Sequence, residues 1–124
     1  MDLLIDTQSL LWTAVAPGKL SADARNAIAD PRSSIFISAV VAFEYIDLSR
    51  RGRFGVDAPF EPIVTRLAAM ILDYPAAASQ LAASLPQHHL DPVDRMLIAH
   101  AMSIDVPIVT ADRTVRAYPV RTIW

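Results

Sequence analysis

The chain has 124 residues, enough for one domain that buries its own hydrophobic core. It contains no cysteine, which excludes disulfides, thiolate metal sites and cysteine nucleophiles, and its formal net charge of −2 excludes binding of nucleic acid through bulk positive charge. The sequence starts with acids rather than the basic residues of a signal peptide, and no apolar run approaches the roughly 20 residues of a membrane span. We therefore expect a cytoplasmic protein with no membrane partner.

The first half of the chain predicts two units in which a strand is followed by helix. The expected elements are a strand at residues 2–5, a helix that Pro17-Gly18 ends, a helix over 21–29, a strand at 35–37, and a helix capped by Ser38 that runs to about Arg51. Both strands are apolar at consecutive positions, which is typical of a parallel strand covered on both faces.

The second half continues this alternation. The expected elements are a loop over 53–62, a helix over 62–72, a weak strand at 72–74, a helix over 76–85, a helix that begins at Asp91-Pro92, a strand at 106–110, a short helix, and a final stretch at 120–124. Strands alternating with helices predict an α/β fold with a mainly parallel sheet. With no repeat or linker in view, we expect a single domain over residues 1–124.

Four acidic residues occupy positions that suggest a shared site. Asp6 and Asp112 each lie at or just past the carboxyl end of an apolar strand, at the sheet edge where ligand sites of parallel sheets form. Glu44 and Asp94 lie in helices that follow strands. Converging carboxylates would repel one another unless a cation lay between them, and oxygen ligands favour Mg²⁺ or Mn²⁺. Such a site suits phosphodiester hydrolysis, in which divalent ions activate water and polarise the phosphoryl group.

Each acid also has a purely structural interpretation. Asp6 is suited to cap a helix, Glu44 to solvate a surface, Asp94 to interact with its helix dipole, and Asp112 to form a turn or cap the last helix. Position by position, these interpretations stay open. The structural interpretations are weakened because acids lie at strand ends near both ends of the chain, at Asp6 and at Asp112.

Four segments, taken in order, resemble the motifs of PIN-domain nucleases, in the branch of VapC-type toxins. They are Leu4–Trp12, Ile37–Tyr45, Leu90–Ala99 and Ile108–Arg113, and the closing Pro119–Trp124 is also typical. The resemblance implies a PIN-like three-layer α/β/α sandwich with a central, mainly parallel sheet. The sequence departs from the pattern at Gln8, where this branch often has histidine, and at Leu48, where it commonly has lysine.

The same resemblance implies an activity and partners. It implies a Mg²⁺- or Mn²⁺-dependent endoribonuclease, the toxin of a type II toxin–antitoxin pair, which forms a homodimer and is inhibited by a cognate antitoxin. The implied catalytic and metal-site residues are Asp6, Glu44, Asp94 and Asp112, with Asp6 and Asp94 as the first choice for direct ligands. Two alternatives stay open: a catalytically idle PIN module that binds within an antitoxin–DNA repressor complex, and a metallohydrolase directed at DNA or phosphomonoesters.

Several other polar residues are weaker candidates for contacts with substrate. Thr110 could assist a metal-bound water or form a turn, and Arg95 and Arg113 follow two of the acids and could pair with carboxylates or touch RNA. Arg50, Arg51 and Arg53 could bind RNA phosphates or the antitoxin, although a solvated helix end explains them more simply.

The histidines and aromatic residues are interpreted structurally. His88-His89 is taken as a loop before the Asp91 cap, because adjacent residues rarely face one ion and no partner acid has suitable spacing. We interpret His100 as a histidine at the edge of the core. Phe43, Tyr45 and Phe60 serve either core packing or a hydrophobic interface, and the sequence does not separate the two.

Overall fold

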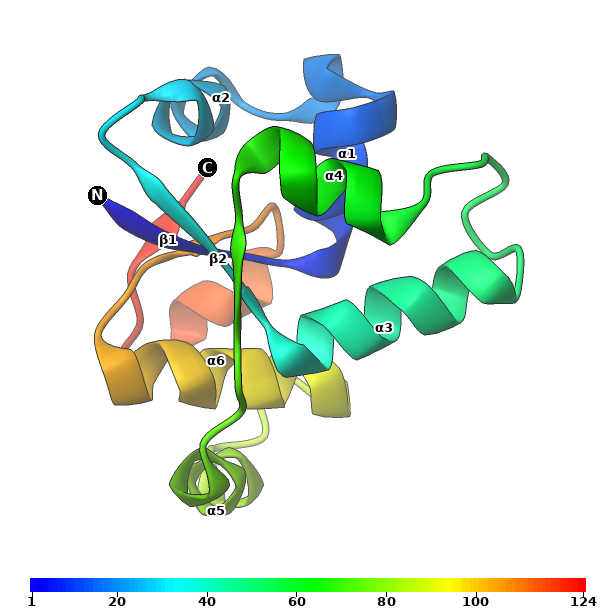
Figure 1. Ribbon diagram of the computed structural model, residues 1–124. Coiled ribbons are helices and arrows are strands. Elements are labelled where there is room, and N and C mark those ends of the chain that lie inside the picture. Colours follow the sequence, from blue (N-terminus) through cyan, green and yellow to red (C-terminus); the bar gives the residue numbers. More distant parts are fainter.

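A computed structural model describes residues 1–124 and contains one sheet of five parallel strands with helices on both faces (Figure 1). The strands are β1 (Asp2–Ile5), β2 (Ser34–Ser38), β3 (Met70–Leu72), β4 (Ile108–Val109) and β5 (Thr122–Ile123). Their order in the sheet is β3-β2-β1-β4-β5, and every neighbouring pair is parallel. The predicted α/β class with a parallel sheet is therefore confirmed.

The central strand β1 is buried from both sides. Leu3, Leu4 and Ile5 have no exposed surface, as the run of apolar residues at consecutive positions predicted. Leu4 is paired with Phe36 of β2 on one side and with Ile108 of β4 on the other. This strand thus fixes the positions of its two neighbours.

The helices form two layers. They are α1 (Thr7–Val15), the 3₁₀ turn η1 (Pro17–Lys19), α2 (Ala22–Ala29), α3 (Ala39–Arg50), α4 (Phe60–Leu67), α5 (Ala76–Ser84), α6 (Pro92–Ile104) and the 3₁₀ helix η2 (Arg113–Ala117). Figure 1 shows α1, α2 and α4 over one face of the sheet and α5 and α6 over the other. Helix α3 contacts α1, α4 and α6, so it bridges the two layers.

Helix starts follow the predicted capping chemistry with one exception. The side chains of Asp6, Ser21 and Asp91 each accept a hydrogen bond from a backbone N–H in the first turn of α1, α2 and α6. Ser38 precedes α3, but its side chain makes no capping bond; its Oγ lies 2.9 Å from Nδ1 of the buried His100. The expected cap at Ser38 was wrong, because a buried imidazole is a competing partner.

The middle of the chain differs from the prediction in its boundaries. The predicted helix over 62–72 is instead α4, which begins at Phe60 and ends at Leu67, and the weak strand at 72–74 is instead β3, at Met70–Leu72. The helix ends where Ala68 adopts a left-handed conformation (φ 49°), without the glycine that usually marks such an end. The early end frees residues 70–72 to pair with β2.

The order in which the chain adds strands to the sheet reverses at β1. The chain passes from β1 to β2 and β3 on one side, then crosses through α5 and α6 to β4 on the other side of β1. In open parallel sheets, a crevice forms at the carboxyl ends of the strands where the order reverses. The region beyond the ends of β1 and β4 is therefore where this topology forms a ligand site. No helix has the length and apolar character needed to cross a membrane.

Candidate active site

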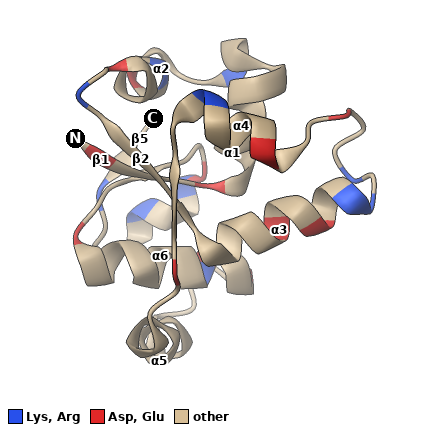
Figure 2. Ribbon diagram, viewed as in Figure 1, with Lys and Arg blue, Asp and Glu red and all other residues tan.

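An acidic cavity of about 400 Å³ opens beyond the carboxyl ends of β1 and β4. Five carboxylate residues line it and no lysine or arginine does; the lining consists of Asp6, Thr7, Gln8, Glu44, Leu48, Phe54, Asp91, Asp94, Ala111 and Asp112. All four acids singled out in the sequence therefore face one cavity. Figure 2 shows the acidic positions along α3 and the basic residues gathered at its far end, next to the following loop.

Asp6 links β1 to α1 and caps that helix. Its backbone N–H donates to the carbonyl of Val109, which continues the pairing with β4, and its Oδ1 accepts from the N–H of Ser9 at 2.8 Å. Burial raises the pKa of Asp6, while hydrogen bonds from Ser9 and from the Thr110 hydroxyl oppose the increase. The capping interpretation of Asp6 is correct, and the same side chain also lines the cavity.

Glu44 reaches the cavity from α3 and is held by α1. The Thr7 hydroxyl donates to its Oε1 at 2.5 Å. Burial raises the pKa of Glu44, the Thr7 bond lowers it, and the charge of Asp91 raises it again. Glu44 is thus a partly buried carboxylate with a fixed orientation and not a surface glutamate.

Asp94 lies in the first turn of α6, whose amino end faces the cavity. Burial raises its pKa to about 7, and the charge of Asp91 adds to the increase. Asp91 caps the same helix by accepting from the N–H groups of Val93 and Asp94. A carboxyl with such a pKa is destabilised as an anion until a cation or a proton compensates it.

Asp112 follows β4 and begins η2. Its Oδ1 accepts from the N–H of Thr114, and its own N–H donates to the Thr110 hydroxyl at 3.0 Å. Partial burial raises the pKa of Asp112, but hydrogen bonds from His89 and Thr114 outweigh that effect, and the net pKa is below its ordinary value. Asp112 is thereby favoured as an anion. Thr110 is itself buried and shapes the turn beside Asp6.

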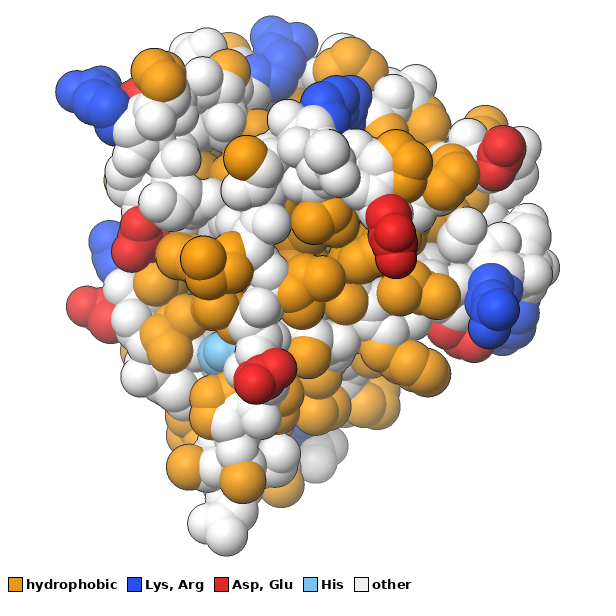
Figure 3. All heavy atoms as spheres, in the orientation of Figure 1, with side chains coloured by type: hydrophobic (Ala, Val, Ile, Leu, Met, Phe, Trp, Pro, Cys, Tyr) orange, Lys and Arg blue, Asp and Glu red, His pale blue; other side chains and the backbone are white.

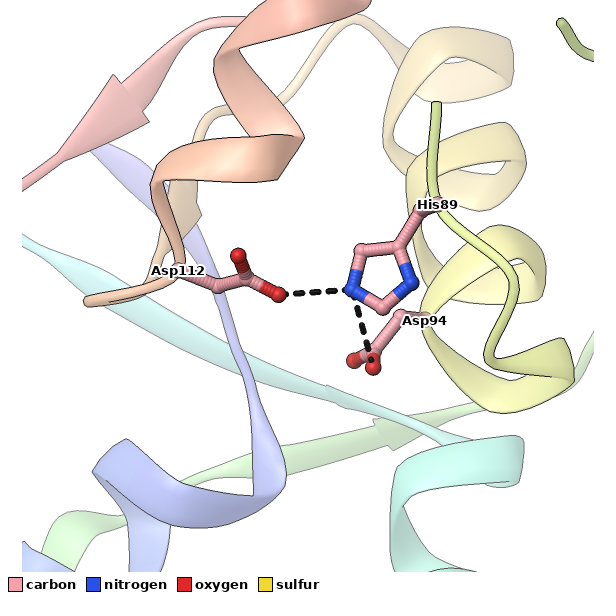
Figure 4. A group of neighbouring side chains, drawn as sticks. All are labelled: His89, Asp94 and Asp112. Atoms are coloured by element: carbon pink, nitrogen blue, oxygen red, sulfur yellow. Dashed lines mark hydrogen bonds and ion pairs between the residues drawn. The ribbon is translucent and has the colours of Figure 1, made fainter. Parts of the chain in front are cut away.

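His89 was wrongly interpreted as part of an uninvolved loop. Its Nε2 lies 2.6 Å from Asp112 Oδ2 and 3.3 Å from Asp94 Oδ2 (Figure 4). One nitrogen of this histidine and one oxygen of each acid lie within 4.8 Å of one another, a group that could hold a metal ion. Asp6 and Glu44 line the same cavity but lie outside that tight group. Spacing along the chain does not reveal this contact, because the loop folds back over the start of α6.

Arg95 bonds to backbone carbonyls and pairs with no carboxylate, although its position after Asp94 left such a pair open. Its guanidinium donates to the backbone carbonyls of four residues: Ala82, Leu85, Pro86 and His89. It therefore fixes the segment between α5 and α6. Arg113 is exposed and makes no ion pair. Neither arginine lines the cavity.

The remaining candidates lie away from the acidic cavity. Arg51 pairs with Asp47 at 2.9 Å at the exposed end of α3. His100 is buried, as expected for the edge of the core, and burial lowers its pKa. Tyr45 and Phe60 are buried core residues, whereas Phe43 is 69% exposed.

Sequence reasoning missed two functional candidates, Thr7 and His89. Thr7 directly follows Asp6, and its partner Glu44 is 37 residues away. The available signal was the hydroxyl next to the first acid, but only the packing of α1 against α3 makes it a partner of Glu44. His89 carried a weaker signal, a histidine two residues before a capping aspartate.

The sequence matches the PIN domain family over residues 3–120, so the chain belongs to that family. A search among curated protein sequences found no significant match.

Solved structures share its fold at low sequence identity. VapBC2 of Rickettsia felis, bound to a DNA fragment from its promoter, is 15% identical with a TM-score of 0.67 over 100% of both chains. Mycobacterium tuberculosis VapC20, a toxin that cleaves the sarcin-ricin loop, is 14% identical with a TM-score of 0.66 over 95% of both chains. DNA-bound VapBC of Salmonella typhimurium is 20% identical with a TM-score of 0.63, covering 98% of this chain and 96% of that one.

Proposed function

We propose that this chain, as a single PIN domain over residues 1–124, is a divalent-metal-dependent endoribonuclease and the toxin of a type II toxin–antitoxin pair. The observation that carries the proposal is the convergence of four carboxylates, from separate parts of the chain, on one cavity without a basic residue. One of the similar structures is described as a toxin that cleaves the sarcin-ricin loop, and several are VapBC complexes, which supports the same assignment.

The donor set fits a divalent cation. Carboxylate oxygens are hard ligands, which favours Mg²⁺ or Mn²⁺. Burial raises the pKa values of Asp6, Glu44 and Asp94, and the charges of neighbouring acids add to the increase, so a bound cation would stabilise their anionic forms. We assign Asp6 and Asp94 as direct ligands, with Glu44 and Asp112 sharing metal, water or outer positions.

The catalytic chemistry then divides between the ion and the chain. A bound divalent ion supplies activation of a water and polarisation of the phosphoryl group. Glu44, oriented by Thr7, is placed to accept a proton from a water in the cavity. Thr110 fixes the turn that carries Asp112, and Gln8 and Leu48 shape the wall where the RNA would enter.

The proposed partners are RNA, a second copy of the chain and a cognate antitoxin, in the cytoplasm. Exposed apolar side chains support a protein partner: Phe43 and Ile46 on α3, and Met70 and Ile71 on β3, are 40–69% exposed. Helix α3 and strand β3 are in contact, and Figure 3 shows hydrophobic side chains gathered on this face. The basic turn at Arg50, Arg51 and Arg53 remains a proposed contact for RNA or antitoxin.

The decisive experiment measures RNA cleavage by the purified protein with Mg²⁺, with Mn²⁺ and with a chelator. We expect metal-dependent cleavage that Asp6→Asn and Asp94→Asn each reduce by more than 100-fold, while Asp57→Asn, an exposed control, retains activity. Equal cleavage by all four proteins would overturn the proposed site. Binding of an antitoxin and DNA without any cleavage would favour the idle module, and preference for DNA or a phosphomonoester would reassign the substrate.

A further inference from the structure

His89 lies behind the acidic cavity and not in it. It does not line the cavity, whereas both carboxylates that it contacts do. Its side chain is only 14% exposed. Figure 4 shows the imidazole between Asp112, at the start of η2, and Asp94, on α6. The ring therefore touches the acids from the protein side and leaves their cavity face open.

The tautomer of His89 follows from its second nitrogen. The backbone N–H of Asp91 donates to His89 Nδ1 at 3.1 Å. A nitrogen that accepts this bond carries no hydrogen, so the hydrogen of the neutral ring is on Nε2. Nε2 is then a donor to Asp112 Oδ2 at 2.6 Å and has no free lone pair for a metal ion. His89 is in this arrangement a hydrogen-bond donor rather than a ligand.

The backbone of His89 is fixed as firmly as its ring. Its N–H donates to the hydroxyl oxygen of Tyr118 at 2.8 Å, and its carbonyl accepts from Arg95 at 3.1 Å. Tyr118 in turn donates to the carbonyl of Pro86 at 2.6 Å, which closes the same turn. Three separate hydrogen bonds, from Asp91, to Tyr118 and from Arg95, thus determine where Nε2 points.

The fixed position of the His89 ring determines the orientation of the Asp112 carboxylate. Its Oδ1 is occupied by the N–H of Thr114 and its Oδ2 by His89, so the carboxylate has one orientation. The same Nε2–H lies close to Asp94 and offsets the repulsion between the two acids. Hydrogen bonds of this kind to a ligating carboxylate tune the affinity of a metal site.

We propose that His89 is a positioning residue of the acidic cavity: its Nε2–H, directed by Asp91, Tyr118 and Arg95, holds the Asp112 and Asp94 carboxylates in the arrangement that binds a divalent cation. The inference rests on the proposed metal-dependent function. His89 supports the acids of that cavity from the protein side. It assigns the ring a role that the neighbouring His88 does not share, because the His88 ring packs against Tyr118.

The first test observes the tautomer directly in the metal-free protein. Long-range ¹H–¹⁵N spectra at neutral pH distinguish a protonated from an unprotonated ring nitrogen, and His88→Ala and His89→Gln assign the signals. We expect hydrogen on Nε2 and none on Nδ1 of His89. A hydrogen on Nδ1 with none on Nε2 would overturn the proposal, because Nε2 would then accept instead of donate and would be free to act as a ligand. This measurement does not depend on any enzymatic activity.

The second test measures Mn²⁺ affinity by calorimetry for the wild type, His89→Ala, His89→Gln and His88→Ala. Glutamine places an amide N–H near the position of Nε2, so it should restore the donor. We expect about tenfold weaker binding for His89→Ala, substantial recovery for His89→Gln, and no change for His88→Ala. Unchanged or tighter binding by His89→Ala would overturn the proposal, as would equal losses in the alanine and glutamine variants.

The two levels of the hypothesis fail in different ways. If the wild type binds no Mn²⁺ and cleaves no RNA, the proposed function fails, and the tautomer measurement alone then decides whether the hydrogen-bond geometry is correct. If the wild type binds Mn²⁺ and His89→Ala binds it equally well, only the role of His89 fails.

Discussion

The hydroxyl of Thr7 donates a hydrogen bond to Glu44 Oε1 at 2.5 Å and so connects the first turn of α1 to the middle of α3. Thr7 is almost completely buried, and its side chain has no other hydrogen-bond partner. The bond joins the two helices that follow β1 and β2, and it sets the direction in which Glu44 enters the cavity.

Replacing Thr7 with valine should weaken the site without unfolding it. Valine keeps the shape of threonine but removes the donor, so the pKa of Glu44 should rise further and its orientation should broaden. We expect about tenfold weaker Mn²⁺ binding, measured by calorimetry. Thr13→Val is the matched control, because Thr13 lies on the same helix and donates to the carbonyl of Leu10. The same loss in both variants would count against a specific role for Thr7.

The metal-free protein should lose stability as the pH rises from about 4 to about 7. The pKa of Asp94 is about 7 in the folded protein and near its ordinary 3.8 when unfolded. Between these values the folded chain holds a proton that the unfolded chain has released, so the free energy of unfolding falls with increasing pH. The raised pKa values of Asp6 and Glu44 act in the same direction.

Denaturant titrations in the presence of a chelator check this dependence. Asp94→Asn should flatten the decrease between about pH 4 and about pH 7, whereas Asp57→Asn, at an exposed position, should follow the wild type. Parallel curves for the wild type and Asp94→Asn would show that Asp94 titrates normally.

Metal binding should release protons in an amount that depends on pH. A carboxylate must lose its proton before it coordinates a cation, and Asp94 is largely protonated below its pKa of about 7. Calorimetry in two buffers of different ionisation enthalpy should therefore detect release of about one proton at pH 6 and much less at pH 8. No release at pH 6, with binding intact, would exclude Asp94 as the group that titrates.

Arg95 should contribute to stability and not to substrate affinity. Its guanidinium donates to four backbone carbonyls, and charged hydrogen bonds of this kind contribute about 1.5–3 kcal/mol each before solvent exposure reduces them. We expect Arg95→Lys to lower the free energy of unfolding by about 2 kcal/mol, because lysine cannot reproduce the planar fork. Arg113→Ala should change it by less than about 0.5 kcal/mol. A raised KM for RNA with unchanged stability would instead assign Arg95 to substrate binding.

The acids of the cavity could be selected from sequence because of where strands end. Asp6 follows β1 directly and Asp112 lies three residues beyond β4, and the parallel arrangement brings those ends to one edge. The order of the helices around them, which brings Glu44 and Asp94 to the same edge, came from the resemblance and not from spacing. Local patterns carry no information on which face of a helix meets a distant strand end.

The features that escaped prediction depend on contacts between distant residues. His89 meets Asp112 across 23 residues, and only the folded turn between α5 and α6 makes that contact. Helix α4 ends at a left-handed Ala68, a conformation that alanine's own preferences disfavour, and this end decides where β3 begins. Ser38 bonds to His100 across 62 residues instead of capping its own helix.

Asp94 and Arg95 are consecutive residues with different roles. Asp94 faces the cavity, whereas Arg95 fixes the turn before the helix. Consecutive positions on an α-helix differ in direction by about 100°. Insertion or deletion of a single residue between Pro92 and Asp94 would therefore turn the carboxylate out of the cavity and the guanidinium away from its carbonyls at once. Over its evolution this helix should accept many substitutions on its outer face, but its first turn should admit no change of length.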